Sequence, residues 1–200
     1  NSLIPRHPFS CSLIGPRGTS KTTVINNTLT NPAIFRGVFH KIIIMSPSIR
    51  LDTKWAALMK EKRILARNQA IPASTRIDLF GLTPRQYDKG RIDPECLFHE
   101  YRQDVLQDLI KEQEEAFELY GENMNKVLVI IDDAPALDVF NTKKGNLYNK
   151  LAVYLRHVRI SCIQVTQSYK MMPRVVRVNQ SNVLLFKTEN LGELKKVWEE

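Results

Sequence analysis

The sequence contains little cysteine and no long hydrophobic run. Its three cysteines, Cys11, Cys96 and Cys162, are far apart, and two of them lie inside apolar stretches. This placement favours buried thiols over disulfides or metal ligands. The four histidines are scattered without the spacing of a metal site. The apolar runs are too short for a transmembrane helix, and residues 1–10 do not resemble a signal peptide. We therefore expect an intracellular protein.

Acidic residues are absent from one long stretch of the chain. Between Val139 and Thr188 there are nine lysines and arginines and no aspartate or glutamate, whereas acids crowd between Glu100 and Glu122. The net charge of +8 arises in residues 1–100, which hold 15 basic and 7 acidic residues, because residues 101–200 hold 14 of each. A basic face beside an acidic element predicts a polyanionic partner. A solvated basic surface explains the same charges equally well.

The chain of 200 residues, 43% of them hydrophobic, suits one globular domain. Apolar runs alternate with helical patterns, which predicts an α/β fold with a mainly parallel sheet covered on both faces. The expected strands are Phe9–Gly15, His40–Ser48, Lys126–Asp133, Ile160–Gln167 and Asn182–Lys187. The expected helices are Lys21–Thr30, Lys54–Gln69, Tyr101–Tyr120 (with Val105, Leu109 and Phe117 on one face) and Gly145–His157, with a last one that begins at Asn190.

One region does not follow this alternation. Residues 71–94 contain three prolines and two glycines and show no periodicity, so we expect an insertion or connecting region at about residues 50–100. The last helix reads as unfinished, which predicts that C-terminal parts of the domain are missing.

The stretch GPRGTSKTT is close to a phosphate-binding loop, or Walker A motif. The usual pattern is glycine, four residues, then Gly-Lys-Ser/Thr. A predicted strand precedes the stretch and a predicted helix follows it, as such loops require. Lys21 would reach the β- and γ-phosphates, and the Thr22 hydroxyl would bind Mg²⁺. The expected nucleotide-binding residues are Gly15, Pro16, Arg17, Gly18, Thr19, Ser20, Lys21, Thr22 and Thr23.

Ser20 departs from this pattern, because it occupies the position of the second glycine. Glycine there normally allows the backbone to approach the phosphate closely, and a side chain costs strain or space. Serine is a small substitute, so we expect a tolerated loop that binds nucleotide more weakly. The alternative is a helix N-terminal turn that merely contains a lysine.

Two further polar features follow predicted strands. In VLVIIDDA an apolar strand ends in Asp132 and Asp133, which is a Walker B arrangement. Asp132 would hold Mg²⁺, and Asp133 stands where many ATPases place a glutamate that polarises the attacking water. Gln167 ends the next strand and would sense the γ-phosphate or orient water. Ligands bind at the carboxyl ends of parallel strands, so the three features should converge. The alternatives are a capping Asp pair and a polar strand end.

Several arginines and lysines are candidates for other roles. Arg156 and Arg159 precede the strand that ends in Gln167, and either could reach the γ-phosphate of a neighbouring subunit as an arginine finger. Lys170, Arg174 and Arg177 could contact DNA phosphates or the nucleotide. For all five residues a solvated surface position is the competing interpretation.

The motifs favour ATP over GTP. A GTPase would show Asp-x-x-Gly after its Mg²⁺ strand and an Asn/Thr-Lys-x-Asp base-reading motif. DDAPALD lacks the first pattern, and NTKKG lacks the aspartate of the second.

Taken together, GPRGTSKTT, VLVIIDDA, LAVYLRHVRISCIQVTQ and MMPRVVRVNQSNVLLFK resemble one family. The chain is similar to the genome-packaging ATPases of large nucleocytoplasmic DNA viruses, including poxviruses, and of virophages. These enzymes belong to the FtsK–HerA branch of the P-loop ATPases. The resemblance covers about residues 9–187 and is loose between residues 46 and 125. It implies a RecA/FtsK-like P-loop NTPase domain, a three-layer sandwich, over residues 1–200.

The resemblance also implies a function. It predicts a ring, with a hexamer suspected, that hydrolyses ATP with Mg²⁺ and drives double-stranded DNA into a preformed viral capsid in the infected cell. Lys21, Asp132, Asp133 and Gln167 would act in catalysis, with Arg156 as the finger acting in trans. Two alternatives stay open: another DNA pump or helicase of the same superfamily, and a nucleotide-binding assembly protein with little hydrolysis.

Overall fold

A six-stranded sheet forms the centre of the molecule. The structure is a computed structural model that describes residues 4–61, 63–66, 91–140 and 147–199. All strand pairs are parallel, and the strand order is β3-β2-β4-β5-β1-β6. The strands are β1 (Ser10–Ile14), β2 (Lys41–Met45), β3 (Leu97–Phe98), β4 (Val127–Ile131), β5 (Ile160–Thr166) and β6 (Asn182–Leu185).

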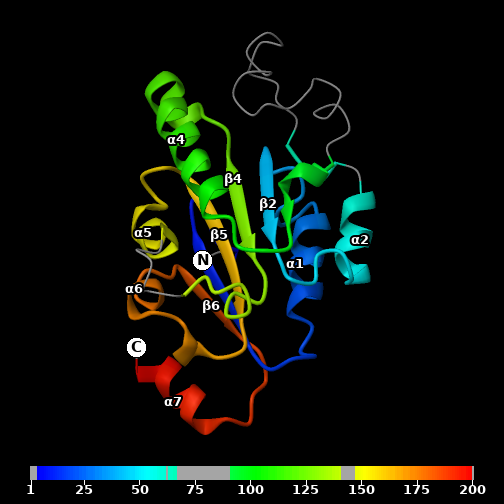
Figure 1. Ribbon diagram of the computed structural model, residues 1–200, viewed down its shortest axis with the longest axis vertical. Helices are drawn as coiled ribbons and strands as arrows, with labels where there is room; N and C mark the ends of the chain where they lie inside the picture. Colours follow the sequence, from blue (N-terminus) through cyan, green and yellow to red (C-terminus); the bar gives the residue numbers. More distant parts are fainter. Residues whose placement is uncertain (1–3, 62, 67–90, 141–146, 200) are drawn as a thin grey trace.

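Helices cover both faces of this sheet (Figure 1). One face carries α1 (Lys21–Thr30) and α2 (Thr53–Lys60), and the other carries α4 (Gln103–Tyr120), α5 (Leu147–Tyr154) and α6 (Arg174–Arg177). A last helix, α7 (Leu191–Glu199), lies below the sheet in this view. Short 3₁₀ turns are η1 (Pro94–Cys96), η2 (Gly121–Asn123) and η4 (Tyr169–Met171). The predicted α/β three-layer arrangement is confirmed.

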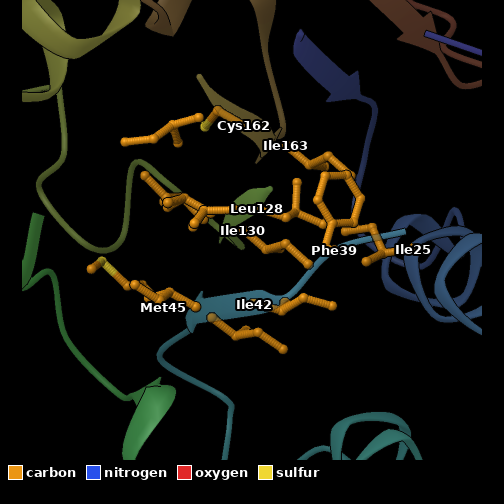
Figure 2. Packing of buried hydrophobic residues seen from close by; sticks show 14 of the residues in the cluster. Ile25, Phe39, Ile42, Met45, Leu128, Ile130, Cys162 and Ile163 are labelled. Atoms are coloured by element: carbon orange, nitrogen blue, oxygen red, sulfur yellow. The ribbon is translucent and has the colours of Figure 1, made fainter. Parts of the chain in front are cut away.

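The central strands are buried on both faces, which explains their continuous apolar sequences. Every residue of β1, β4 and β5 is buried, as are the last four of β2. Figure 2 shows Ile42 and Met45 of β2 beside Leu128 and Ile130 of β4, with Ile25 of α1 packed against the same core. Burying each such side chain contributes about 1.5–3 kcal/mol, so the core fixes the strands that carry the site.

The strand order decides which loops meet. Strand β5 lies between β1 and β4, so the residue after β5 stands between the loop after β1 and the residues after β4. The register places Ile14 opposite Thr166 and Ile131 opposite Gln164. The backbone continues this alignment, since Ala134 N–H donates to the Val165 carbonyl at 2.9 Å. All three strand ends therefore open onto the same edge of the sheet.

The predicted helix Lys54–Gln69 is wrong in its second half. Helix α2 ends at Lys60, and Arg63 has a left-handed backbone with φ of 66°. The chain then pairs with the segment before β2: Ala66 N–H donates to the Phe39 carbonyl, and Gly37 N–H donates to the Ile64 carbonyl. These tertiary hydrogen bonds outweigh helix propensity. Residues 67–69 lie outside the described residues, as do residues 70–90 of the predicted insertion.

The predicted apolar face of the acidic helix is only partly right. Helix α4 buries Leu106, Leu109, Gln113 and Ala116, whereas Phe117 is 45% exposed. The buried face of α4 is therefore formed by these four residues, and Phe117 lies outside it. Sequence patterning also missed β3, because its two residues are too short to show a period.

The three cysteines belong to the hydrophobic core. Cys11, Cys96 and Cys162 are buried free thiols, as predicted. Burial raises the pKa of Cys11 and Cys162 to about 12 and that of Cys96 to about 11, so these thiols stay protonated at neutral pH.

Within the described ranges no helix combines the length and apolar character that crossing a bilayer requires.

Candidate functional site

The loop between β1 and α1 begins with a glycine that has no room for a side chain. A Cβ on Gly15 would lie 2.6 Å from the Phe186 Cβ, at the end of the neighbouring strand β6. The Gly15 N–H donates to the Thr166 carbonyl at 3.2 Å, and the Phe186 N–H donates to the Ile14 carbonyl at 2.8 Å. Gly15 therefore fixes the start of the loop against both neighbouring strands.

Two positions of the loop have left-handed backbone. Gly18 has φ of 80°, and Ser20 has φ of 64° and ψ of 25°. The left-handed region costs a non-glycine residue roughly 1–2 kcal/mol, which explains why phosphate-binding loops place glycine at the position of Ser20. Ser20 also precedes the first residue of α1, and its side chain makes no capping hydrogen bond. The first N–H groups of α1 therefore remain available to an anion.

Lys21 is folded back onto the loop. Its Nζ donates to the carbonyls of Gly15 and Pro16 at 2.6 and 2.7 Å, and Thr19 Oγ1 lies 3.4 Å away. Burial lowers the pKa of Lys21, and the carboxylates of Asp132 and Asp133 oppose that shift. The ammonium group is thus held at the loop.

Asp132 is a buried carboxylate at the end of β4. Its Oδ2 accepts hydrogen bonds from Ser46 Oγ at 3.2 Å and from Thr22 Oγ1 at 3.5 Å. Burial raises the pKa of Asp132, while the hydrogen bond from Ser46 opposes the shift. A buried carboxylate of this kind is stabilised by a nearby cation. The backbone supports its position, because Asp132 N–H donates to the Met45 carbonyl of β2.

Asp133 and Gln167 are joined by their side chains. Gln167 Nε2 donates to Asp133 Oδ1 at 3.2 Å, so the residue directly after β5 meets the second carboxylate after β4. Asp133 has a left-handed backbone with φ of 51°. This conformation turns the chain sharply after Asp132, so that the two adjacent carboxylates have different partners.

These groups surround one pocket of about 340 Å³. Its lining includes Arg17, Gly18, Thr19, Ser20, Lys21 and Thr22 of the loop, together with Asp132, Asp133 and Gln167. Gly15 is buried, and Gly15, Pro16 and Thr23 do not belong to this lining. The three sequence motifs that were expected at one sheet edge therefore meet there.

Sequence reasoning missed a fourth contribution to the pocket. Ser48, Asp52 and Lys54 line it from the segment between β2 and α2, and Ser46 contacts Asp132. Two hydrogen bonds hold the backbone of Lys54. Asn26 Nδ2 donates to the Lys54 carbonyl at 2.7 Å, and the Lys54 N–H donates to Asp52 Oδ1 at 2.9 Å. The signal was available, because β2 was a predicted strand and these residues follow its carboxyl end.

The residues expected to hold Mg²⁺ suit that ion chemically. Mg²⁺ prefers oxygen ligands, and it is bound through one or two protein groups together with waters and phosphate oxygens. Thr22 Oγ1 and Asp132 Oδ2 supply two oxygen atoms 3.5 Å apart at the floor of the pocket. A bound cation would also relieve the cost of burying the Asp132 carboxylate.

Arg156 and Arg159 lie away from this pocket. Both precede β5, whose length of roughly 20 Å separates them from Gln167. Arg156 is exposed and lines a separate hollow with His157 and Asn179. Arg159 Nη1 pairs with Glu122 Oε1 at 3.3 Å. Neither arginine can reach the nucleotide pocket of its own chain, and of the two Arg156 is the more available to another chain.

The three nucleic-acid candidates are not equivalent. Lys170 in η4 and Arg174 at the start of α6 are exposed. Arg177 is partly buried: its Nη1 donates to the Met172 carbonyl at 2.9 Å, and its guanidinium lies 5.4 Å from the centre of the Tyr169 ring. Arg177 therefore has partners within the chain, and Lys170 and Arg174 are the better candidates for contacting phosphates.

The backbone at Ser20 leads to a first prediction. Replacing Ser20 with glycine should tighten binding of an ATP analogue several-fold, because it removes a side chain from the part of the loop where the phosphates would bind. The folding free energy should change by less than about 1 kcal/mol, since relief of left-handed strain offsets the greater entropy of the unfolded chain. Titration with a fluorescent ATP analogue and urea unfolding measure the two quantities.

Ser20→Ala is the matched control, because it keeps the Cβ and removes only the hydroxyl. It should bind like the wild-type chain. If Ser20→Ala binds as tightly as Ser20→Gly, the hydroxyl alone limits affinity, and the Cβ does not.

Comparison with known proteins places this geometry in a known fold. No protein-family model and no curated protein matches the sequence. Among solved structures, the chain is similar to the genome packaging NTPase B204 from Sulfolobus turreted icosahedral virus 2 in complex with ATPγS. The TM-score is 0.60 at 15% identity, over 96% of this chain and 81% of that one. B204, the DNA-packaging ATPase from Sulfolobus turreted icosahedral virus, matches with a TM-score of 0.61 at 16% identity, covering 97% and 83% of the two chains.

A protein with a different description shares the fold. EssC ATPases 2 and 3 from Geobacillus thermodenitrificans match with a TM-score of 0.52 at 12% identity, over 94% of this chain and 34% of that one. Similarity at such low identity establishes the architecture alone. The chain has the fold of P-loop NTPases, and the resemblance inferred from its motifs is matched by these structural neighbours at the level of the fold.

Proposed function

We propose that this chain is an ATP-hydrolysing motor that moves double-stranded viral DNA into a preformed capsid in the infected cell. One observation carries the proposal: the phosphate loop, Asp132, Asp133 and Gln167 surround a single pocket in a fold shared with genome packaging NTPases. The work would be done by a ring of identical chains, of which a hexamer is the expected form.

The loop and helix α1 would bind the phosphates. The free N–H groups at the start of α1 and the positive end of its dipole favour an anion at this point. Lys21 already lies at the loop, and its ammonium would leave the carbonyls of Gly15 and Pro16 to contact phosphate oxygens. Thr22 and Asp132 would hold Mg²⁺, which when bound neutralises charge on the β- and γ-phosphates.

Asp133 and Gln167 would position the attacking water. A carboxylate oxygen accepts a hydrogen bond from the water, and the Gln167 amide can either donate to that carboxylate or contact the γ-phosphate. The present contact of 3.2 Å between Gln167 Nε2 and Asp133 Oδ1 couples the two side chains. A γ-phosphate that attracted Gln167 would therefore also release Asp133 for the water.

The DNA contact is proposed for the exposed part of the acid-free stretch. Of the basic residues not assigned to the arginine finger, Lys150, Lys170, Arg174 and Lys187 are exposed in it. By contrast, Arg159 pairs with Glu122 of the acidic segment. Phosphate contacts of this kind give affinity without sequence preference.

The test is ATP hydrolysis by the full chain with and without double-stranded DNA, at several salt concentrations. We expect DNA to stimulate turnover, and log affinity for DNA to fall linearly with log salt. Lys170→Ala and Arg174→Ala should each reduce the salt slope by about 1 and weaken binding for all sequences alike. Lys60→Ala, an exposed lysine on α2, is the control.

Two outcomes would favour a different function. ATP binding without turnover in either condition would favour a nucleotide-dependent assembly protein, for which the strained Ser20 is the supporting observation. DNA-stimulated turnover that stays the same when capsid vertices are added would favour a pump or helicase of the same superfamily. DNA affinity that ignores salt would contradict binding through the basic surface.

A further inference from the structure

The segment after β5 is held from two sides. On one side, Gln167 contacts Asp133, and the Ala134 N–H donates to the Val165 carbonyl. Within the segment itself, the Ser168 N–H lies 3.4 Å from Thr166 Oγ1, and that hydroxyl donates to the Ser168 carbonyl at 3.1 Å.

The second side is a buried carboxylate from the last helix. Glu193 of α7 is 7% exposed. Its Oε1 accepts from Ser168 Oγ at 2.6 Å, and its Oε2 accepts from the Tyr169 N–H at 2.7 Å. Burying a carboxylate is costly unless it is hydrogen-bonded. Both of these hydrogen bonds come from the two residues that directly follow Gln167.

Glu193 is itself held in place at the start of α7. Its N–H donates to the carbonyl and to Oδ1 of Asn190, at 3.0 and 3.2 Å. One turn later, Val197 packs against a small cluster of Tyr169, Met172 and Ile14, the last residue of β1. Helix α7 thus reaches the segment after β5 through one charged anchor and one apolar anchor.

We propose that Glu193 is a positioning residue that sets the orientation of Gln167 toward Asp133 and the γ-phosphate. This inference rests on the proposed ATP hydrolysis. Glu193 does not belong to the lining of the nucleotide pocket. It acts by fixing the backbone of Ser168 and Tyr169, so that the amide of Gln167 is presented to the pocket in one orientation.

The kinetic test compares Glu193→Ala, Gln167→Ala and the double variant of the full chain. Glu193→Ala should lower kcat about 10-fold or more, because a small misplacement of a reacting group is costly. KM should stay within about 2-fold of wild type, because the phosphate loop is untouched. If Glu193 acts through Gln167, adding Glu193→Ala to Gln167→Ala should lower kcat by less than about 2-fold further. Losses that multiply would overturn the proposal.

Two further variants separate positioning from general damage. Glu193→Gln keeps an acceptor for the Tyr169 N–H and a partner for the Ser168 hydroxyl, so it should recover most of the lost turnover. Glu199→Ala removes an exposed glutamate of the same helix, which lies 3.7 Å from Lys195, and should leave kcat unchanged. A thermal melt of each variant reports on folding.

A second measurement tests the positioning role of Glu193 without relying on turnover. It applies even if the wild-type chain hydrolyses no ATP, an outcome that would by itself refute the proposed hydrolysis. Hydrogen–deuterium exchange at the Tyr169 amide should be slow in the wild type and in Glu199→Ala, and at least about 10-fold faster in Glu193→Ala. Faster exchange confined to residues 166–169 supports the positioning role. Unchanged exchange would show that Glu193 does not hold this segment.

Discussion

Replacing Lys21 with alanine is expected to abolish ATP turnover and to weaken nucleotide binding severely. Lys21 Nζ is the ammonium group of the loop, held by the carbonyls of Gly15 and Pro16 beside the pocket. Removing one partner of a buried, hydrogen-bonded charge pair costs about 2–5 kcal/mol. At about 1.4 kcal/mol for each factor of ten, this corresponds to a loss of roughly 30-fold to several-thousand-fold in affinity for the phosphates.

The measurement is steady-state ATP hydrolysis together with titration of a fluorescent ATP analogue. Lys60→Ala is the control, since it removes an exposed lysine that lies outside the pocket lining. The variant should fold normally, because Lys21 is only partly buried and its contacts are with the loop itself. Unchanged turnover in Lys21→Ala would refute the assignment of this loop as the nucleotide site.

Much of this site could be predicted from the sequence because parallel strands end at a common edge. The rule assigns the residues that follow three buried apolar runs, Lys21, Asp132 and Gln167 among them, to one edge of the sheet. The order of the strands within the sheet could not be predicted from the sequence in the same way. Only the structure places β5 between β1 and β4 and so brings Gln167 against Asp133.

The rest of the site depends on contacts that leave no local pattern. Ser46 reaches Asp132 because β2 pairs with β4, and Glu193 reaches Ser168 because the chain returns after β6. The incorrect prediction for the second half of the Lys54–Gln69 helix has the same cause. Ile64 and Ala66 form hydrogen bonds with the segment before β2, and the local sequence does not show these partners. A helix pattern in the sequence records local preference, whereas these pairings are decided by the rest of the chain.

Replacing Arg156 with alanine is expected to reduce turnover by about 10³-fold or more, and only in the assembled state. An arginine finger that neutralises transition-state charge contributes a factor of that size. Arg156 is exposed at the edge of the sheet opposite the pocket, too far to serve its own chain. Isolated chains should therefore lose nothing, whereas a cis role would lower turnover equally in both states.

Arg159→Ala is the matched control for charge and position. Arg159 stands three residues away and pairs with Glu122, so its guanidinium is engaged within the chain. Its loss should affect turnover far less than the loss of Arg156. A thermal melt accounts for any effect of breaking that ion pair. Equal losses for the two variants would point to a general effect of positive charge at this edge.

Mixing two inactive variants gives the sharpest test of a finger acting in trans. A chain with Arg156→Ala keeps an intact phosphate loop, and a chain with Lys21→Ala keeps an intact Arg156. In a ring of head-to-tail contacts assembled from equal amounts, about a quarter of the interfaces combine an intact loop with an intact arginine. Turnover should therefore recover to about a quarter of the wild-type value. No recovery, in rings shown by co-purification through a different affinity tag on each variant to contain both, would exclude Arg156 as a residue shared between neighbouring sites.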